Sequence, residues 1–174
     1  MDASRAPSFS RSIPKGDNRE RAVCDHCGFV DYVNPRIVVG VVATWEDRFL
    51  VCRRAIDPRK GFWTIPAGFL EQGETPEDGA AREAAEEAGA DVAVESLIGI
   101  YSVPRISQVQ MMFRGRLRSP EVAAGEESLE VRLSTWDEIP WDELAFPSVR
   151  AALRHFDEVR GLEQFPSFRL TLGA

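Results

Sequence analysis

The stretch GFLEQGETPEDGAAREAAEEAGA, residues 68–90, decides how this chain is interpreted. It places three glutamates within five residues of an expected helix: Glu83, Glu86 and Glu87. Like charges three or four residues apart on a helix repel each other by about 0.2–0.5 kcal/mol per pair. A divalent cation can neutralise such a cluster, because Mg²⁺ prefers oxygen ligands. The pattern therefore indicates either a metal-binding helix face or an ordinary solvated surface.

Signals at both ends of the stretch support the helix. Thr75 is a suitable N-cap, Pro76 stands at the first helical position, and Gly89 provides a C-terminal stop. Asp78 completes a pattern close to a capping box, and Arg82, four residues later, can brace the acidic cluster. At about 100° per residue the glutamates share one sector of the helix. We expect small residues to fill the opposite side: Ala81, Ala84, Ala85 and Ala88.

Length, composition and charge limit the possible functions. The chain has 174 residues and is 44% hydrophobic, which suits one globular domain with a small appendage. Its net charge is −7 and it has no long Lys/Arg block, which argues against a nucleic-acid-binding surface. No apolar run approaches the ~18 residues that span a bilayer, and residues 1–21 lack the apolar core of a secretory signal. We therefore expect a cytoplasmic protein without a nucleic-acid or membrane partner.

The remaining pattern predicts a mixed α+β domain. Apolar Val149, Leu153, Phe156 and Val159 recur at helical spacing and predict a second helix over residues 146–161. We expect β-strands within residues 36–45, 48–55, 91–103, 107–119, 121–136 and 165–173. Antiparallel hairpins interrupted by two helices are typical of an α+β sandwich.

The spacing within residues 68–90 resembles the Nudix box, the signature of hydrolases that cleave nucleoside diphosphates linked to another moiety. The matching positions are Gly68, Glu74, Arg82, Glu83, Glu86, Glu87 and Gly89, with Ala84 and Ala90 at the aliphatic positions. Beyond the box, DYVNPRIVVG, SVPRISQVQMMFRG and ESLEVRLSTWDEIPWDELAFPSV are similar to the zinc-ribbon-bearing Nudix branch. That branch includes NADH pyrophosphatases and ADP-ribose/FAD pyrophosphatases. The resemblance implies a Nudix α/β/α sandwich with a mixed β-sheet.

The resemblance also implies roles for individual residues. Metal ligands would be the carboxylates of Glu83, Glu86 and Glu87 and the backbone carbonyl of Ala67, with Mg²⁺ or Mn²⁺ as the ion. Arg82 would hold the glutamates in place, and Glu74 would structure the preceding turn. Family members often add a glutamate from a later loop, as metal ligand or as base for the attacking water. Similarity to NADH-cleaving enzymes indicates Glu130, with Glu126 and Glu127 as rivals.

Substrate-binding residues are expected in the segment YSVPRISQ, residues 101–108. NADH-cleaving relatives carry a Ser-Gln-Pro-Trp-type motif here, and its absence disfavours NADH. Pro104 resembles a proline of ADP-ribose-cleaving members, and we place Ser107 and Gln108 beside it in the substrate site. Arg54 could meet phosphates, unless it only forms a solvated strand end. Three aromatic residues could stack on a base or could equally belong to the core: Phe62, Trp63 and Phe69.

The segment CDHCG, residues 24–28, would be half of a four-cysteine zinc ribbon. No second CxxC precedes it, and Cys52 on an expected strand is interpreted as a buried apolar residue. We therefore expect no structural zinc. We divide the chain into an N-terminal arm with this incomplete zinc-ribbon-like knuckle, residues 1–35, and a Nudix hydrolase domain, residues 36–174.

The resulting expectation is Mg²⁺-dependent hydrolysis of ADP-ribose or FAD to AMP plus the second phosphate, by a homodimer acting on a small nucleotide. Alternatives are hydrolysis of NADH, CoA or another dinucleotide, and a non-catalytic Nudix-like module that binds nucleotides. Such modules typically lose a box glutamate, and here all of them are present. Catalysis is therefore preferred.

Overall fold

The computed structural model describes residues 7–173. These residues belong to two compact units that meet between Asn34 and Pro35, one residue before the boundary expected from the sequence. Each unit is described by itself. None of the helices in the described part of the chain is long and apolar enough to cross a membrane.

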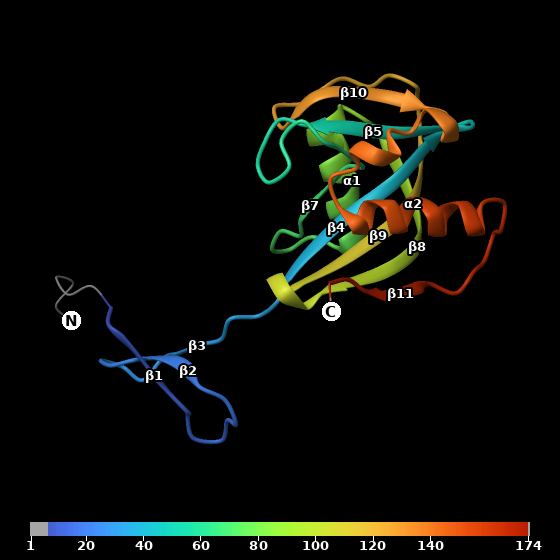
Figure 1. Ribbon diagram of the computed structural model, residues 1–174. Helices are drawn as coiled ribbons and strands as arrows, with labels where there is room; N and C mark the ends of the chain where they lie inside the picture. The colour runs from blue at the N-terminus through green and yellow to red at the C-terminus, as the bar shows by residue number, and fades with distance from the viewer. Residues whose placement is uncertain (1–6, 174) are drawn as a thin grey trace. The chain divides into compact units, whose positions relative to one another are not determined.

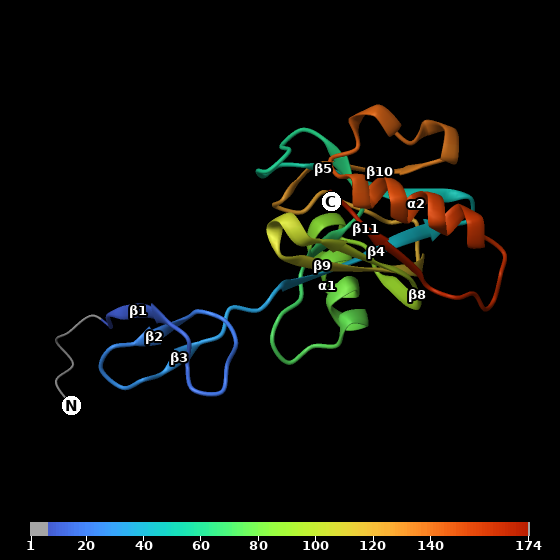
Figure 2. The same ribbon diagram turned by 60° about the horizontal axis from the view of Figure 1, so that its bottom comes forward.

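The N-terminal unit contains a three-stranded antiparallel sheet (Figure 2). Its strands, in spatial order, are β1 (Phe9–Ser12), β2 (Arg21–Cys24) and β3 (Val30–Asp31). The CxxC segment forms the turn after β2, where the Gly28 N–H donates to the carbonyl of Cys24 at 2.9 Å. Backbone N–H groups of Cys27 and then His26 lower the pKa of the Cys24 thiol. Cys24 is buried and Cys27 is exposed, and neither forms a disulfide.

The second unit is built on a mixed sheet (Figure 1). Its main path runs β10-β5-β4-β9-β8-β11, while β6 pairs with β5 and β7 with β4. The β4–β9 and β8–β11 pairs are parallel and the others antiparallel. The strands are β4 (Arg36–Trp45), β5 (Arg48–Arg54), β6 (Trp63–Thr64), β7 (Ala67–Phe69), β8 (Val92–Val103), β9 (Gln108–Leu117), β10 (Ser128–Ser134) and β11 (Phe168–Thr171). Three 3₁₀ turns complete the unit: η1 (Pro104–Ile106), η2 (Trp136–Glu138) and η3 (Trp141–Glu143).

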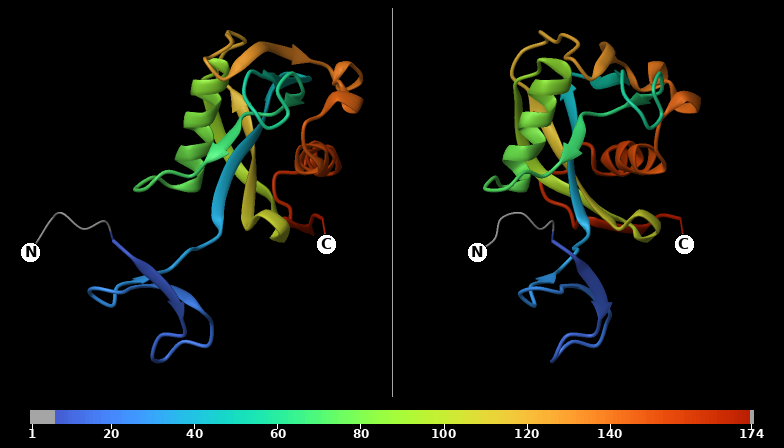
Figure 3. Two further views of the ribbon diagram at one scale, coloured as in Figure 1. Left: turned by 60° about the vertical axis from the view of Figure 1, so that its left-hand side comes forward. Right: turned by 90° about the vertical axis from the view of Figure 1, so that its left-hand side faces the viewer.

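Helices α1 (Pro76–Ala88) and α2 (Pro147–Val159) cover opposite faces of this sheet (Figure 3). Alternation along β4 explains both contacts, because successive side chains of a strand point to opposite faces. Val39 and Val41 pack into the core cluster on the α1 side, whereas Val42 belongs to the cluster that includes Leu153 and Phe156 of α2. The expected α/β/α sandwich with a mixed sheet is therefore confirmed.

The buried face of α1 differs from the one expected. Its alanines against the sheet are Ala80, Ala84 and Ala88, whereas Ala85 is exposed and Ala81 only half-buried. The glutamates are therefore not opposite an alanine face. Two of them, Glu83 and Glu87, lie one turn apart on a line beside the buried alanines, at the edge where helix and sheet meet.

Candidate active site

The main candidate site is a cavity of about 770 Å³ in the second unit. One wall carries carboxylates from α1 and from the acidic loop that follows β9, which we define as residues 121–127. These carboxylates belong to Glu83, Glu86, Glu87, Glu126 and Glu127. The other lining residues are mainly apolar or carry amides, Arg54 contributes a guanidinium, and Asp57 and Glu71 add two further carboxylates. The cavity thus joins an acidic wall to surfaces suited to a neutral ring system.

Two of the glutamates are buried and the third is not. Glu83 is 9% exposed and Glu87 is 5% exposed, whereas Glu86 is exposed. Burial raises the pKa of Glu87 to about 8; the Ala67 N–H, 3.3 Å from its Oε2, opposes the rise and the Glu83 charge adds to it. Burial also raises the pKa of Glu83, against the lowering effect of Arg82. A cation in the cavity would favour the ionised form of both carboxylates.

Arg82 connects the acidic helix to the loop before it. Its Nη1 donates to Glu83 Oε1 and to Glu86 Oε2, both at 2.8 Å. Its Nε and Nη2 donate to the two carboxylate oxygens of Glu74, and Nη2 also donates to the Phe69 carbonyl at 3.0 Å. Glu74 and the glutamates together raise the Arg82 pKa further above its ordinary value. Arg82 thus contacts two glutamates of the acidic cluster and in addition Glu74 of the preceding loop. The Asp78 side chain instead accepts from the hydroxyl of Thr75, the N-cap of α1.

The absence of a side chain at Gly68 leaves space for the Glu83 carboxylate. A Cβ atom built on Gly68 would overlap both carboxylate oxygens of Glu83. Only glycine leaves space for that carboxylate between β7 and α1.

The acidic loop provides its cavity carboxylates from Glu126 and Glu127, not from Glu130. Glu130 lies on β10, is exposed, and approaches Arg53 at 3.9 Å. A break in the β10–β5 register between Ser128 and Glu130 shifts the alternation of side chains at this point. Glu130 therefore does not line the cavity, whereas its rivals Glu126 and Glu127 do.

The residues expected to bind substrate divide into two groups. Arg54 and Gln108 line the cavity, as does Phe69. Pro104 and Ser107 do not line it, although Ile106, which lies between them at the end of η1, does.

One strand supplies wall residues that the sequence interpretation missed. Gln110 and Met112 follow Gln108 on β9 at two-residue intervals, so all three face the cavity. The Gln110 amide donates to Gln108 Oε1 at 3.1 Å, and its own Oε1 is buried without a hydrogen-bond partner in the described part of the chain. Strand alternation extended from Gln108 was the signal that could have identified both residues.

Comparison with known proteins places this chain in a family. The model described as the NUDIX domain matches residues 34–157. The chain belongs to the Nudix family. A second model, described as Nudix N-terminal and named for a zinc ribbon, matches residues 6–33. The Nudix enzyme class inferred from the box is therefore confirmed.

Several Nudix proteins are similar over most of the chain. ADP-ribose pyrophosphatase of Methanocaldococcus jannaschii is 32% identical over 119 residues, which cover 66% of this chain and 69% of that protein. The NAD-capped RNA hydrolase NudC of Pseudomonas aeruginosa is 29% identical over 147 residues, which cover 81% of this chain and 50% of NudC. The crystal structure of a NUDIX hydrolase from Nitrosomonas europaea has a TM-score of 0.91 and 41% identity, covering 99% of this chain and 98% of that one. The chain thus spans from half to just over two thirds of these two curated relatives.

Nudix enzymes generally use divalent metal ions, and the acidic wall suits one. Within residues 7–173, no three His, Cys, Asp or Glu side chains are grouped tightly enough to hold an ion by themselves. Arg82 forms ion pairs with Glu83 and Glu86. Mg²⁺ is usually bound through one or two carboxylates, with water and substrate phosphates as the other ligands. The buried pair Glu83 and Glu87 meets that requirement.

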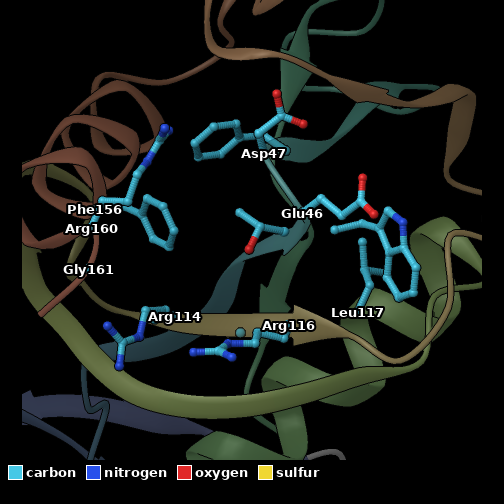
Figure 4. Close-up of a pocket in the computed structure, with 12 residues that line it drawn as sticks. Glu46, Asp47, Arg114, Arg116, Leu117, Phe156, Arg160 and Gly161 are labelled. Carbon is cyan, nitrogen blue, oxygen red and sulfur yellow. The ribbon is translucent and has the colours of Figure 1, made fainter. Parts of the chain in front are cut away.

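A second cavity, of about 600 Å³, lies at the C-terminal ends of β4 and β9 (Figure 4). The first cavity is lined by residues nearer the N-terminal ends of these strands. The carboxylates that line it are Glu46 and Asp47, from the turn between β4 and β5. Its arginines already have carboxylate partners among the described residues: Arg114 and Arg116 pair with Glu95, and Arg160 approaches Asp157. Among the described residues, the carboxylates of Glu83 and Glu87 line the first cavity and not the second. We therefore place the Nudix chemistry in the first cavity.

Proposed function

We propose that this Nudix protein hydrolyses the pyrophosphate bond of ADP-ribose or FAD, giving AMP plus the second phosphate. The observation that carries the proposal is that carboxylates of α1 and amide and apolar side chains of β9 line the same cavity. The acidic wall suits a metal-bound pyrophosphate. The lining from β9 suits a base or ribose, because ligand sites combine apolar surface with a few placed polar groups.

Each wall residue has a proposed role. Glu83 and Glu87 hold Mg²⁺ (or Mn²⁺), with Glu86 and the Ala67 carbonyl as further oxygen ligands. When bound, the ion would offset charge on the phosphate oxygens and lower the pKa of water. Arg82 keeps the glutamates in position, and Arg54 contacts a phosphate.

We assign the loop carboxylate to Glu127. It lines the cavity, and its negative charge contributes to the raised pKa of both Glu83 and Glu87. In the reaction, water oxygen attacks phosphorus, the bond from phosphorus to the bridging oxygen breaks, and Glu127 accepts the water proton.

The substrate class has support from the comparisons and from the β9 wall. The Methanocaldococcus relative is named for ADP-ribose, and residues 101–108 lack the motif of NADH-cleaving enzymes. The similarity to NudC favours a second candidate function, hydrolysis of the pyrophosphate bond of NADH or of the NAD cap of an RNA. Both candidates contain an adenosine diphosphate, so the same cavity could receive either.

A substrate panel separates these candidates. AMP release would be measured for ADP-ribose, FAD, NADH, CoA and an NAD-capped RNA, with Mg²⁺, with Mn²⁺ and with a chelator. We expect ADP-ribose or FAD to have the highest kcat/KM and the chelator to stop the reaction. A preference for NADH or capped RNA would support the second candidate, and no hydrolysis of any substrate would contradict the proposal. Light scattering of the same preparation tests the predicted homodimer.

A further inference from the structure

The acidic loop, residues 121–127, is hydrogen-bonded to the C-terminal end of α1. The Ala123 N–H donates to the Ala88 carbonyl at 2.8 Å, and the Gly125 N–H donates to the Glu87 carbonyl at 3.1 Å. The last carbonyls of a helix have no partner within the helix itself. The last turn of α1 also contains no basic residue that could provide donors. The loop backbone therefore supplies these donors.

Gly125 lies directly against the helix backbone. A Cβ atom on this residue would overlap the Glu86 carbonyl oxygen and lie 2.9 Å from its carbonyl carbon. Backbone atoms of a packed helix cannot turn aside as a flexible side chain can. Any side chain at position 125 must therefore move the loop away from α1.

The backbone on both sides of Glu127 is anchored. On one side Gly125 binds α1, and its carbonyl accepts from the Ser128 N–H at 3.1 Å. On the other side the Glu127 carbonyl accepts from the Ala55 N–H at 2.8 Å, just after the end of β5. Glu127 is thus held between the helix that carries Glu87 and the edge of the sheet.

We propose that Gly125 is a positioning residue, which fixes Glu127 relative to Glu87 by allowing the loop backbone to contact α1. The inference rests on the proposed role of Glu127 in hydrolysis. Gly125 itself touches no reacting atom. Its absent side chain sets the distance between the loop and the helix, and that distance places the carboxylate in the cavity.

A double-mutant cycle tests this inference, with Gly125→Ala, Glu127→Gln and the double variant compared with the unmodified protein. We expect Glu127→Gln to lower kcat about 100-fold, as loss of a general base does, and Gly125→Ala to lower it at least about tenfold. If Gly125 acts through Glu127, Gly125→Ala will change kcat by less than about twofold in the Glu127→Gln background. Multiplicative losses in the double variant would overturn the inference. The neighbouring exposed residue provides a matched control, Ala124→Ser, which should keep kcat and KM unchanged.

Amide hydrogen exchange of the unmodified protein gives a second test that does not depend on a variant folding. We expect the amides of Ala123 and Gly125 to be protected to about the same degree as those in the last turn of α1. Exchange of these amides at the rate of an open loop would overturn the inference. The failures are distinguishable, because an inactive unmodified enzyme contradicts the proposed function, whereas an active enzyme with an unprotected loop contradicts only the role of Gly125.

Discussion

Both carboxylate oxygens of Glu74 accept hydrogen bonds from Arg82, at 2.9 and 3.1 Å, although the two residues belong to different elements. Glu74 lies in the loop before α1, and Arg82 lies in the second turn of the helix. Glu74 Oε1 also accepts from the Glu71 N–H at 2.7 Å, so one carboxylate organises the loop and holds it to the helix. A fork of this kind depends on the planar guanidinium, which presents parallel donors.

Arg82→Lys should therefore impair the protein despite keeping the charge. An ammonium group cannot bind both oxygens of Glu74 while also reaching Glu83 and Glu86. We expect the free energy of unfolding to fall by about 1–3 kcal/mol and kcat to fall at least about tenfold. Urea denaturation and steady-state assays would measure these changes. The matched control is Arg116→Lys, whose exposed pair with Glu95 should contribute less than about 1 kcal/mol. Equal effects of the two substitutions would contradict the bracing role.

Glu87→Gln should nearly abolish hydrolysis while the fold and its thermal stability stay the same or improve. Glutamine keeps the size of the side chain and is neutral, which burial favours at this position, but it removes a metal ligand. Turnover and thermal unfolding would be measured together. Glu77→Gln, at an exposed position in the first turn of the same helix, is the control and should retain activity. Unchanged turnover of Glu87→Gln would show that the acidic helix is not catalytic.

The stability of the metal-free protein should depend on pH through Glu87. Its pKa is raised from 4.5 to about 8 by burial, so the folded state binds this proton more tightly than the unfolded state. The resulting stabilisation is present in full below about pH 4.5 and is lost as the pH rises through about 8. Measured in a chelator, the stability of the unmodified protein relative to Glu87→Gln should therefore fall between about pH 6 and pH 8.5. A difference that stays constant or increases over this range would contradict the assignment.

Zinc analysis of the purified protein should find less than about half an equivalent. Structural zinc sites use four ligands, and the N-terminal unit offers the two thiols of Cys24 and Cys27 without a second CxxC. Elemental analysis with a Cys24→Ser, Cys27→Ser double variant as control would measure this content. A full equivalent that the double variant loses would mean that the two thiols recruit other ligands.

Gln110→Leu should change the ranking of substrates more than the metal requirement. Gln110 lines the cavity together with the glutamates, and its Oε1 has no hydrogen-bond partner among residues 7–173. Each tenfold change in relative kcat/KM corresponds to about 1.4 kcal/mol, which one hydrogen bond can provide. The comparison is kcat/KM for ADP-ribose, FAD and NADH at several Mg²⁺ concentrations. Pro104→Ala, outside the cavity, is the control, and an equal loss for all substrates in Gln110→Leu would contradict a role in selection.

The N-terminal helix of the second unit was predictable because its signals are local. Thr75 caps α1, Pro76 begins it and Gly89 ends it in the left-handed conformation, as their spacing along the chain indicated. The box spacing likewise predicted the family and the sandwich. Such signals depend on residues a few positions apart, so the sequence alone was sufficient to read them.

The tertiary structure decided which residues from distant segments line the cavity together. The break in strand register before Glu130 turns its side chain toward Arg53 and leaves the cavity to Glu126 and Glu127. The hydrogen bond from Gly125 to Glu87 joins segments 38 positions apart along the chain, and no local sequence pattern predicts it. The sequence determined which helix would carry the carboxylates. Only the packed chain decided which loop carboxylates line the same cavity, because strand register and close backbone contact are properties of distant segments brought together by folding.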